Sequence, residues 1–181
     1  MQKLRGILSN VPEINHAEWF SSIAKLLLAN YLIETATKKY RIKEIEFYYY
    51  SKDHKDELTY GFAKNIKSHS ERIQRHKNRQ YQQLTWFFHY SGIDLVIGNI
   101  DNPGGILIRA IEDFDTKENI KGPLVVLLEL LNQEIDVEGN KLLHLRLVQN
   151  DVEFDYDIQS QKRVGLGAGK FQDAPYNFST K

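Results

Sequence analysis

Cysteine is absent from this 181-residue chain, which excludes disulfides, thiol nucleophiles and thiolate metal sites and fits a reducing compartment. Neither sign of charge is in excess, because 24 basic residues balance 24 acidic ones, so the molecule as a whole has no field that favours a polyanionic partner. No apolar run approaches the roughly 20 residues that span a bilayer. The first six residues do not lead into the apolar segment of a signal peptide. We therefore expect a cytoplasmic protein without a membrane partner.

Short motifs of known chemistry are missing as well. The glycine-rich run 165–170 is not a phosphate-binding loop, because Phe171 follows Lys170 where Ser or Thr is required. Lys170 also occupies the third glycine position of a dinucleotide fingerprint. No Gly-x-Ser-x-Gly nucleophile elbow occurs, and the six histidines lack the spacing of metal ligands. We predict no metal and no cofactor.

The apolar pattern predicts both helices and strands. Helical spacing over 16–33 predicts an amphipathic helix. The segment 122–131 opens with Gly-Pro and is interpreted as a buried helix, with a strand as the alternative. Beyond Arg163 we expect an irregular tail. Strands are expected over 41–49, over 84–97 with a break near Ser91-Gly92, over 105–111 as the hairpin partner across the turn 101–104, over 142–148, and over 152–158. No linker divides the chain, so we predict one domain over residues 1–181.

Three features are candidates for one shared cleft. Alternation places Glu44, Glu46 and Tyr48 on one face of the strand 41–49. The aromatic block 86–90 is the second feature, and Arg109, inside an otherwise apolar strand, is the third. A buried arginine needs a carboxylate partner, because burying its charge alone is expensive. The alternative interpretation is a purely structural Arg–Glu pair on a sheet with aromatic packing.

A basic tract lies between these elements in the sequence. Its charge beside exposed aromatics suits a phosphate backbone and an unstacked base, although a solvated helix face explains such a run more often. The basic residues are Lys64, Lys67, Arg72, Arg75, Lys77 and Arg79.

The order of these motifs resembles the 3-methyladenine (alkylpurine) DNA glycosylase family. Glu44-Ile45-Glu46-Phe47-Tyr48 resembles that family's Glu-x-Glu-Ala-Tyr strand, and residues 105–112 resemble its Val-Leu-Ile-Arg-Ala-Leu-Glu strand. Further landmarks in the family's order are the leucine-rich helix 24–33, Gly122-Pro123, Arg163-Val164-Gly165-Leu166 and Tyr176-Asn177-Phe178. The resemblance implies an α+β fold, a single domain with a curved, mainly antiparallel sheet flanked by helices. It also implies a monomer that binds double-stranded DNA in base excision repair.

Roles carried over from the family fall on matching positions. Glu46 matches the general base that deprotonates a water attacking C1′ of a flipped nucleotide, and Arg109 matches an arginine that holds this water and the sugar-phosphate. Tyr48, Phe87 and His89 are the expected base-binding residues. Extrusion exposes the glycosidic bond and leaves a hole in the duplex. The positive charge of an alkylated purine improves it as a leaving group and as a partner for electron-rich rings.

Other roles concern the DNA itself. Tyr90 is matched to the tyrosine that wedges into the duplex, and a one-residue shift would move the wedge and stacking roles to Ser91 and Phe88. The expected contacts to the DNA backbone are Lys64, Lys67, Arg72 and Arg75.

Departures from the family pattern concern the substrate. Asp56-Glu57-Leu58-Thr59 stands where the family has a histidine, Ile97 or Gly98 where it has an asparagine, and Asn177-Phe178 where it has Arg-Phe. The main prediction is therefore a monofunctional purine DNA glycosylase, with altered base specificity as one alternative. A catalytically silent nucleic-acid-binding protein on the same fold is another, and an unrelated structural protein is the third.

Overall fold

The computed structural model describes residues 2–59, 80, 82–136, 138–139, 141–166 and 171–181. Strand β2 (Lys39–Tyr49) is the centre of its sheet, pairing antiparallel with β5 (Gly104–Asp113) on one edge. The other edge of β2 pairs with β1 (Tyr31–Glu34) near its start and with β9 (Asn177–Thr180) farther along. Long alternating segments favour such a central strand, because one face is buried while the other carries polar groups.

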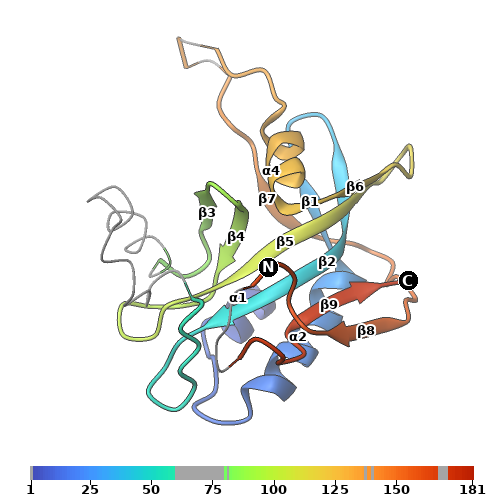
Figure 1. Cartoon of the computed structure of the whole chain (residues 1–181). Coiled ribbons are helices and arrows are strands. Elements are labelled where there is room, and N and C mark those ends of the chain that lie inside the picture. Colours follow the sequence, from blue (N-terminus) through green and yellow to red (C-terminus); the bar gives the residue numbers. More distant parts are fainter. Residues whose placement is uncertain (1, 60–79, 81, 137, 140, 167–170) are drawn as a thin grey trace.

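The remaining strands extend this sheet on both sides (Figure 1). Within the described residues it has nine strands in the order β3-β4-β5-β2-β1-β7, with β6 beside β5 and β8 beside β9, and every ladder is antiparallel. The flanking strands are β3 (Trp86–His89), β4 (Gly92–Val96), β6 (Asn119–Lys121), β7 (Arg146–Gln149) and β8 (Ile158–Gln161).

An irregularity in the β2–β5 ladder lies next to the candidate site. The register shifts between Ile42 and Ile45, so Lys43 and Glu44 are both left off the core face. Such bulges bend a strand and increase its twist. The sheet curls into a half-barrel, which confirms the expected α+β fold with a curved, mainly antiparallel sheet.

Helix α2 (His16–Asn30) covers the apolar face of the central strands. Phe20 stacks on Phe47 of β2 with ring centroids 4.6 Å apart. The predicted helix to residue 33 was wrong at its end, because Tyr31 is extended (φ −126°, ψ 148°) and begins β1. An apolar run of this length suits a buried helix or a buried strand equally, so periodicity alone did not locate the boundary.

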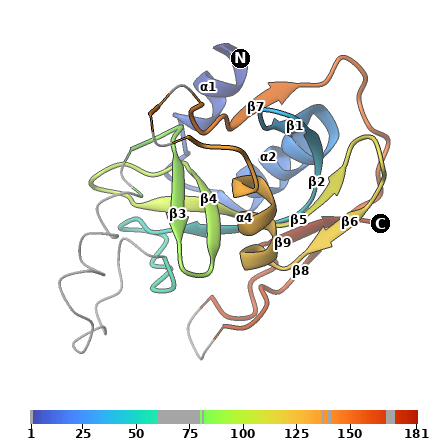
Figure 2. The same ribbon diagram turned by 90° about the horizontal axis from the view of Figure 1, so that it is seen from above.

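Two further helices complete the described structure. Helix α1 (Gln2–Leu8) was not predicted, and its Leu8 is buried in the core. Helix α4 (Pro123–Leu131) confirms the helical interpretation of this segment, with Pro123 at its start as expected. It contacts β4, β5 and β6, beside the β3–β4 hairpin (Figure 2).

The other wrong predictions of secondary structure concern segments after residue 118. The expected strand over 142–148 begins only at Arg146, and residues 152–157 form no strand. Phe154 and Tyr156 lie instead over cations of β2, with the guanidinium of Arg41 4.3 Å from one ring and the ammonium of Lys43 4.3 Å from the other. The tail expected to be irregular contains β9, and β6 was not predicted.

Candidate active site

Glu46 lies at the centre of a hydrogen-bond network on the polar face of β2. Its side chain is 0% exposed, and its carboxylate accepts bonds from four groups. Tyr48 Oη donates to Oε2 over 2.7 Å, and Arg109 Nη1 approaches the same oxygen at 3.4 Å. The backbone N–H of Val164 donates to Oε1 over 2.8 Å, and Asn177 Nδ2 does so over 3.0 Å. Four donors on two oxygens form the environment that a buried carboxylate requires.

Arg109 bridges the two acidic residues of the strand. Its Nε donates to Glu44 Oε1 over 3.0 Å, while its Nη1 faces Glu46. Asn177 Nδ2 makes a parallel bridge, at 2.7 Å from Glu44 and 3.0 Å from Glu46. The predicted partnership between Arg109 and a carboxylate of the neighbouring strand is therefore confirmed.

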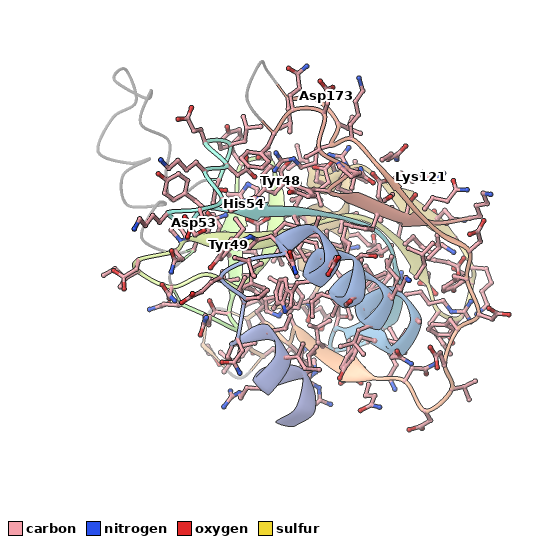
Figure 3. All side chains as sticks on the ribbon, turned by 90° about the horizontal axis from the view of Figure 1, so that it is seen from below. Tyr48, Tyr49, Asp53, His54, Lys121 and Asp173 are labelled. Carbon is pink, nitrogen blue, oxygen red and sulfur yellow. The ribbon has the colours of Figure 1, made fainter. Side chains whose placement is uncertain are left out.

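Tyr48 is held beside Glu46 as a hydrogen-bond donor. Burial raises the pKa of Tyr48 well above its ordinary value, and the negative charge and hydrogen bond of Glu46 raise it further. The hydroxyl therefore keeps its proton at neutral pH and donates it to Glu46. Figure 3 shows Tyr48 and Tyr49 on opposite sides of β2, as alternation requires, with Tyr49 toward α2 and His54.

A buried ion pair between Arg163 and Asp56 holds the backbone next to Glu46 in place. Arg163 and Asp56 are both fully buried, with Nη1–Oδ2 at 2.6 Å and Nη2–Oδ1 at 3.1 Å. Arg163 also donates to the carbonyl of Phe47 over 3.0 Å, and its guanidinium lies 4.5 Å from the Tyr48 ring. Since Val164 is the next residue, this pair anchors the backbone N–H that reaches Glu46. Bidentate geometry of this kind is the strong form of the Arg–carboxylate pair.

A pocket of about 410 Å³ lies next to this hydrogen-bond network. Glu46 does not line it, but three of the groups that bind Glu46 do, namely Tyr48, Arg109 and Val164. The other residues around the pocket are Leu58, His89, Tyr90, Ser91, Asp94, Leu107, Pro123, Gly165 and Leu166. Sequence reasoning therefore located five residues of this site: Glu46, Tyr48, His89, Tyr90 and Arg109.

One wall of the pocket consists of polar residues of the β3–β4 hairpin. His89 Nε2 lies 3.1 Å from Asp94 Oδ1, and Gln80 Nε2 donates to Asp94 Oδ2 over 2.8 Å. A Cβ atom at Gly105 would come within 2.8 Å of the Asp94 carboxylate, so only glycine fits opposite it. Tyr90 lies at the turn of the same hairpin and is 77% exposed.

Other predicted residues lie elsewhere. Phe87 is 1% exposed and stacks behind His89, with ring centroids 5.2 Å apart, instead of lining the pocket. Of the two residues named for a shifted register, Ser91 lines the pocket and Phe88 packs on the core. The backbone-binding residues Lys64, Lys67, Arg72 and Arg75, with Lys77 and Arg79, lie outside the described residues.

Sequence reasoning missed Asp56, Asp94 and Asn177 and gave Arg163 no role. Asn177 was visible only as part of a C-terminal landmark, and Asp94 only as an acidic residue in an apolar strand segment. Across the part of the chain that the structure describes, no group of three or more His, Cys, Asp or Glu is placed to hold a metal ion. No helix in that part is long and apolar enough to cross a membrane.

Comparison with known proteins gives a match over most of the chain. No protein-family model matches the chain. The sequence is 28% identical over 189 aligned positions to the uncharacterized protein L759 of Acanthamoeba polyphaga mimivirus, and the alignment covers 89% of this chain and 85% of that protein. The chain is thus similar along most of its length to a protein encoded by a giant virus.

Proposed function

We propose that this protein is a monofunctional DNA glycosylase that flips a damaged or modified purine out of double-stranded DNA and hydrolyses its N-glycosidic bond. The observation that carries this proposal is Glu46, a buried carboxylate whose partners Tyr48, Arg109 and Val164 all line one pocket. A single carboxylate suffices to deprotonate a water, and no lysine Schiff base is required.

The long contact between Arg109 and Glu46 supports a position for the proposed water. At 3.4 Å it is the longest of the four contacts to Glu46 and exceeds the roughly 2.7–2.9 Å of a strong charge-assisted bond. Arg109 is also one of the residues that line the pocket. Since 3.4 Å leaves no room for an oxygen between the two atoms, the proposed water lies on the pocket side of this contact, where it would accept from Arg109 Nη1, donate to Glu46 Oε2 and face the position of C1′.

The pocket suits a single extruded base. Its volume of about 410 Å³ lies within the roughly 300–1,000 Å³ of small-molecule sites. Tyr48 and His89 are among the residues that line it, and stacking of a base on aromatic rings offsets about 1–3 kcal/mol of the cost of extrusion. In this proposal the exposed ring of Tyr90 fills the gap left in the duplex.

Strand breakage after base loss tests the proposal directly. Duplexes containing 1,N6-ethenoadenine, hypoxanthine or a methylated purine are incubated with the protein, treated with alkali and resolved by length. We expect cleavage at the modified base, and Glu46→Gln should reduce it by about 10²–10⁴-fold because the general base is lost. Glu44→Gln is the matched control, since Glu44 shares Arg109 and Asn177 but does not face the proposed water. Full activity of Glu46→Gln would exclude this mechanism.

A catalytically silent nucleic-acid-binding protein is the second candidate. The observation that favours it is the complete set of donors around Glu46, which leaves its carboxylate fully occupied without a water. This candidate predicts DNA binding that strengthens at low salt, with no base loss from any duplex. An absence of binding even at low salt would point to an unrelated structural protein in which Glu46 and Arg109 merely pair.

A further inference from the structure

The curled sheet has an apolar groove where its two ends approach each other. Strands β3 and β7 are the ends of the strand order, and Trp86 Nε1 of β3 donates to the carbonyl of Leu145, the residue before β7, over 3.1 Å. Helix α1 lies beside β7 (Figure 2) and lines the same cavity. This cavity of about 430 Å³, the edge groove, lies between Leu8 of α1, Trp86 and Leu95 of the β3–β4 hairpin, and Leu147 of β7.

The edge groove is apolar except for two arginines. Seven of the nine described residues that line it are leucine or tryptophan, and the other two are Arg5 and Arg146. Trp86 and Leu95 are opposite each other in the β3–β4 ladder, and Trp86 and Leu147 are only partly buried. A concave, mostly apolar surface with a few polar groups is the usual form of a small-molecule site.

Leu84 contributes to the groove wall from an unusual backbone conformation. Its φ of 64° lies in the left-handed region, which glycine and asparagine adopt far more readily than leucine. Its N–H donates to the Val96 carbonyl over 2.8 Å, which fixes the segment beside β4. Strained backbone of this kind is often found at ligand sites. The side chain of Leu84 completes the apolar wall, which neither glycine nor asparagine would do.

The two arginines of the groove differ in their partners. Arg146 is held by Glu34, with Nη2–Oε1 at 2.5 Å and Nε–Oε1 at 2.7 Å. The same carboxylate also faces Lys39 at 3.6 Å and His144 at 3.2 Å. Arg5 is exposed and forms no ion pair with any of the residues that the structure describes. The groove therefore carries positive charge that no carboxylate in its wall compensates.

We propose that the edge groove binds a fatty-acid-type anion, with its carboxylate at Arg5 and its chain along Trp86 and the leucines. The planar guanidinium of arginine matches the geometry of a carboxylate. An apolar cavity of about 150 Å³ accepts benzene, so a groove of about 430 Å³ has room for a saturated chain of about ten carbons. The edge groove shares no lining residue with the pocket next to Glu46, so this site goes beyond the proposed glycosylase function and does not depend on it.

Fluorescence of Trp86 in the full chain tests this inference. Trp19→Phe leaves Trp86 as the one tryptophan, and Phe keeps the aromatic contact of position 19 with Phe47 on α2's side of the sheet. This protein is titrated with monomeric decanoate and with decanol, and calorimetry gives the stoichiometry. We expect one decanoate per chain, a saturable change in Trp86 emission, and weaker binding of decanol because it lacks the charge. Raising the salt from about 0.05 M to about 0.5 M should weaken the binding of decanoate alone.

Two variants separate the charged part of the groove from its apolar part. Arg5→Gln should weaken decanoate binding by about two- to fivefold, the range of an exposed ion pair, and leave decanol binding unchanged. Leu84→Asn suits the left-handed backbone but removes apolar wall, so it should weaken both ligands to a similar degree. Lys25→Gln is the matched control for Arg5→Gln, since Lys25 is an exposed cation of α2 outside the groove.

Several results would overturn the proposal. Equal binding of decanoate, decanol and decyltrimethylammonium would show apolar contact without recognition of the anion, and so would unchanged decanoate binding in Arg5→Gln. Unchanged binding of both ligands in Leu84→Asn would locate them outside the groove. Sedimentation with equimolar phosphatidylcholine–phosphatidylserine vesicles, without binding of free decanoate, would assign the groove to a membrane surface instead. Base excision is measured at the other pocket, so its success or failure is distinguishable from each of these outcomes.

Discussion

The two faces of strand β2 are built on different principles. The core face consists of Ile45, Phe47 and Tyr49, which are buried against helix α2 and the strands around it. Burial of apolar area stabilises such a face without direction, at about 25 cal/mol per Å². Many apolar side chains of suitable volume satisfy this face, because each contact is replaceable.

On the opposite face, each polar group depends on a specific set of hydrogen-bond partners. Glu46 is bound by Arg109, Val164 and Asn177, which lie 63, 118 and 131 residues farther along the chain. Hydrogen bonds to a buried carboxylate are directional, and removing one partner costs more than the bond itself contributed. This difference indicates that the core face mainly contributes stability. The polar face positions the groups proposed for catalysis, and it forms only when residues far apart in the sequence come together.

Breaking the ion pair beneath the polar face should have the largest effect on stability. Arg163 is linked to residues of both faces of β2. Its side chain donates to the carbonyl of Phe47, and it directly precedes Val164, whose backbone N–H binds Glu46. Asp56→Asn leaves the fully buried guanidinium uncompensated, so we expect the free energy of unfolding to fall by about 3–5 kcal/mol. Denaturant titration measures this loss.

The matched variant for this pair carries Asp56→Leu together with Arg163→Met. Replacing both charges by apolar groups should recover much of the stability. Excision should not recover, since nothing then anchors the Val164 N–H at Glu46. Recovery of both properties would show that the ion pair has no positioning role.

Lowering the pH should reduce the free energy of unfolding through two histidines at the core face of β2. His16 and His54 pack together there, with ring centroids 4.7 Å apart and the ring planes tilted by 45°. Burial lowers the pKa of both, and for His16 the neighbouring His54 lowers it further. Because the folded-state pKa lies below the unfolded value of 6.5, the unfolded chain takes up protons first. The free energy of unfolding should therefore fall as the pH drops below about 6.5, and stay level with respect to these groups above it.

Denaturant titrations between about pH 8 and about pH 5 measure this decline. His16→Gln removes one of the two groups and should flatten the pH dependence without changing excision at neutral pH. An unchanged slope in this variant would mean that the decline arises from carboxylates instead of from the two histidines.

Much of the β2 region was predictable because its signals are local. Alternation of apolar and polar residues over 44–49 predicted the strand and both faces, and a lone arginine in an apolar strand predicted the pair between Arg109 and a carboxylate. The Gly-Pro start predicted helix α4. These features depend on residues close together in the sequence or on a charge that must find a partner.

The remaining contacts could not be predicted from local patterns. Nothing near Asp56 indicates Arg163, and nothing near Asn177 indicates that it bridges Glu44 and Glu46. Phe87 and His89 lie on the same face of β3, and an aromatic run does not specify which of the two reaches the pocket. The alternation over 152–158 imitated a strand, although its aromatic residues contact Arg41 and Lys43. The glycosylase activity itself stays a prediction.

Removing a single methylene from the core face should lower stability moderately and leave excision unaffected. Ile45→Val removes it from a fully buried residue next to Glu46, and such a change costs about 0.5–1.5 kcal/mol. Excision should be unchanged, because the side chain points away from the pocket. A loss of activity comparable with that of Glu46→Gln would show that the two faces are not independent.

The smallest effect on stability is expected at Tyr90, the most exposed residue of the site. Its side chain is 77% exposed at the turn of the β3–β4 hairpin, so Tyr90→Ala should change the free energy of unfolding by no more than about 0.5 kcal/mol. Excision from duplex DNA should nevertheless fall, because the hole left by the extruded base is no longer filled. Exposed Ile100, outside the pocket, is the control: Ile100→Ala should change neither quantity. Equal rates for Tyr90→Ala and wild type on duplex DNA would remove the wedge role, and the polar face would then act only on the base and the water.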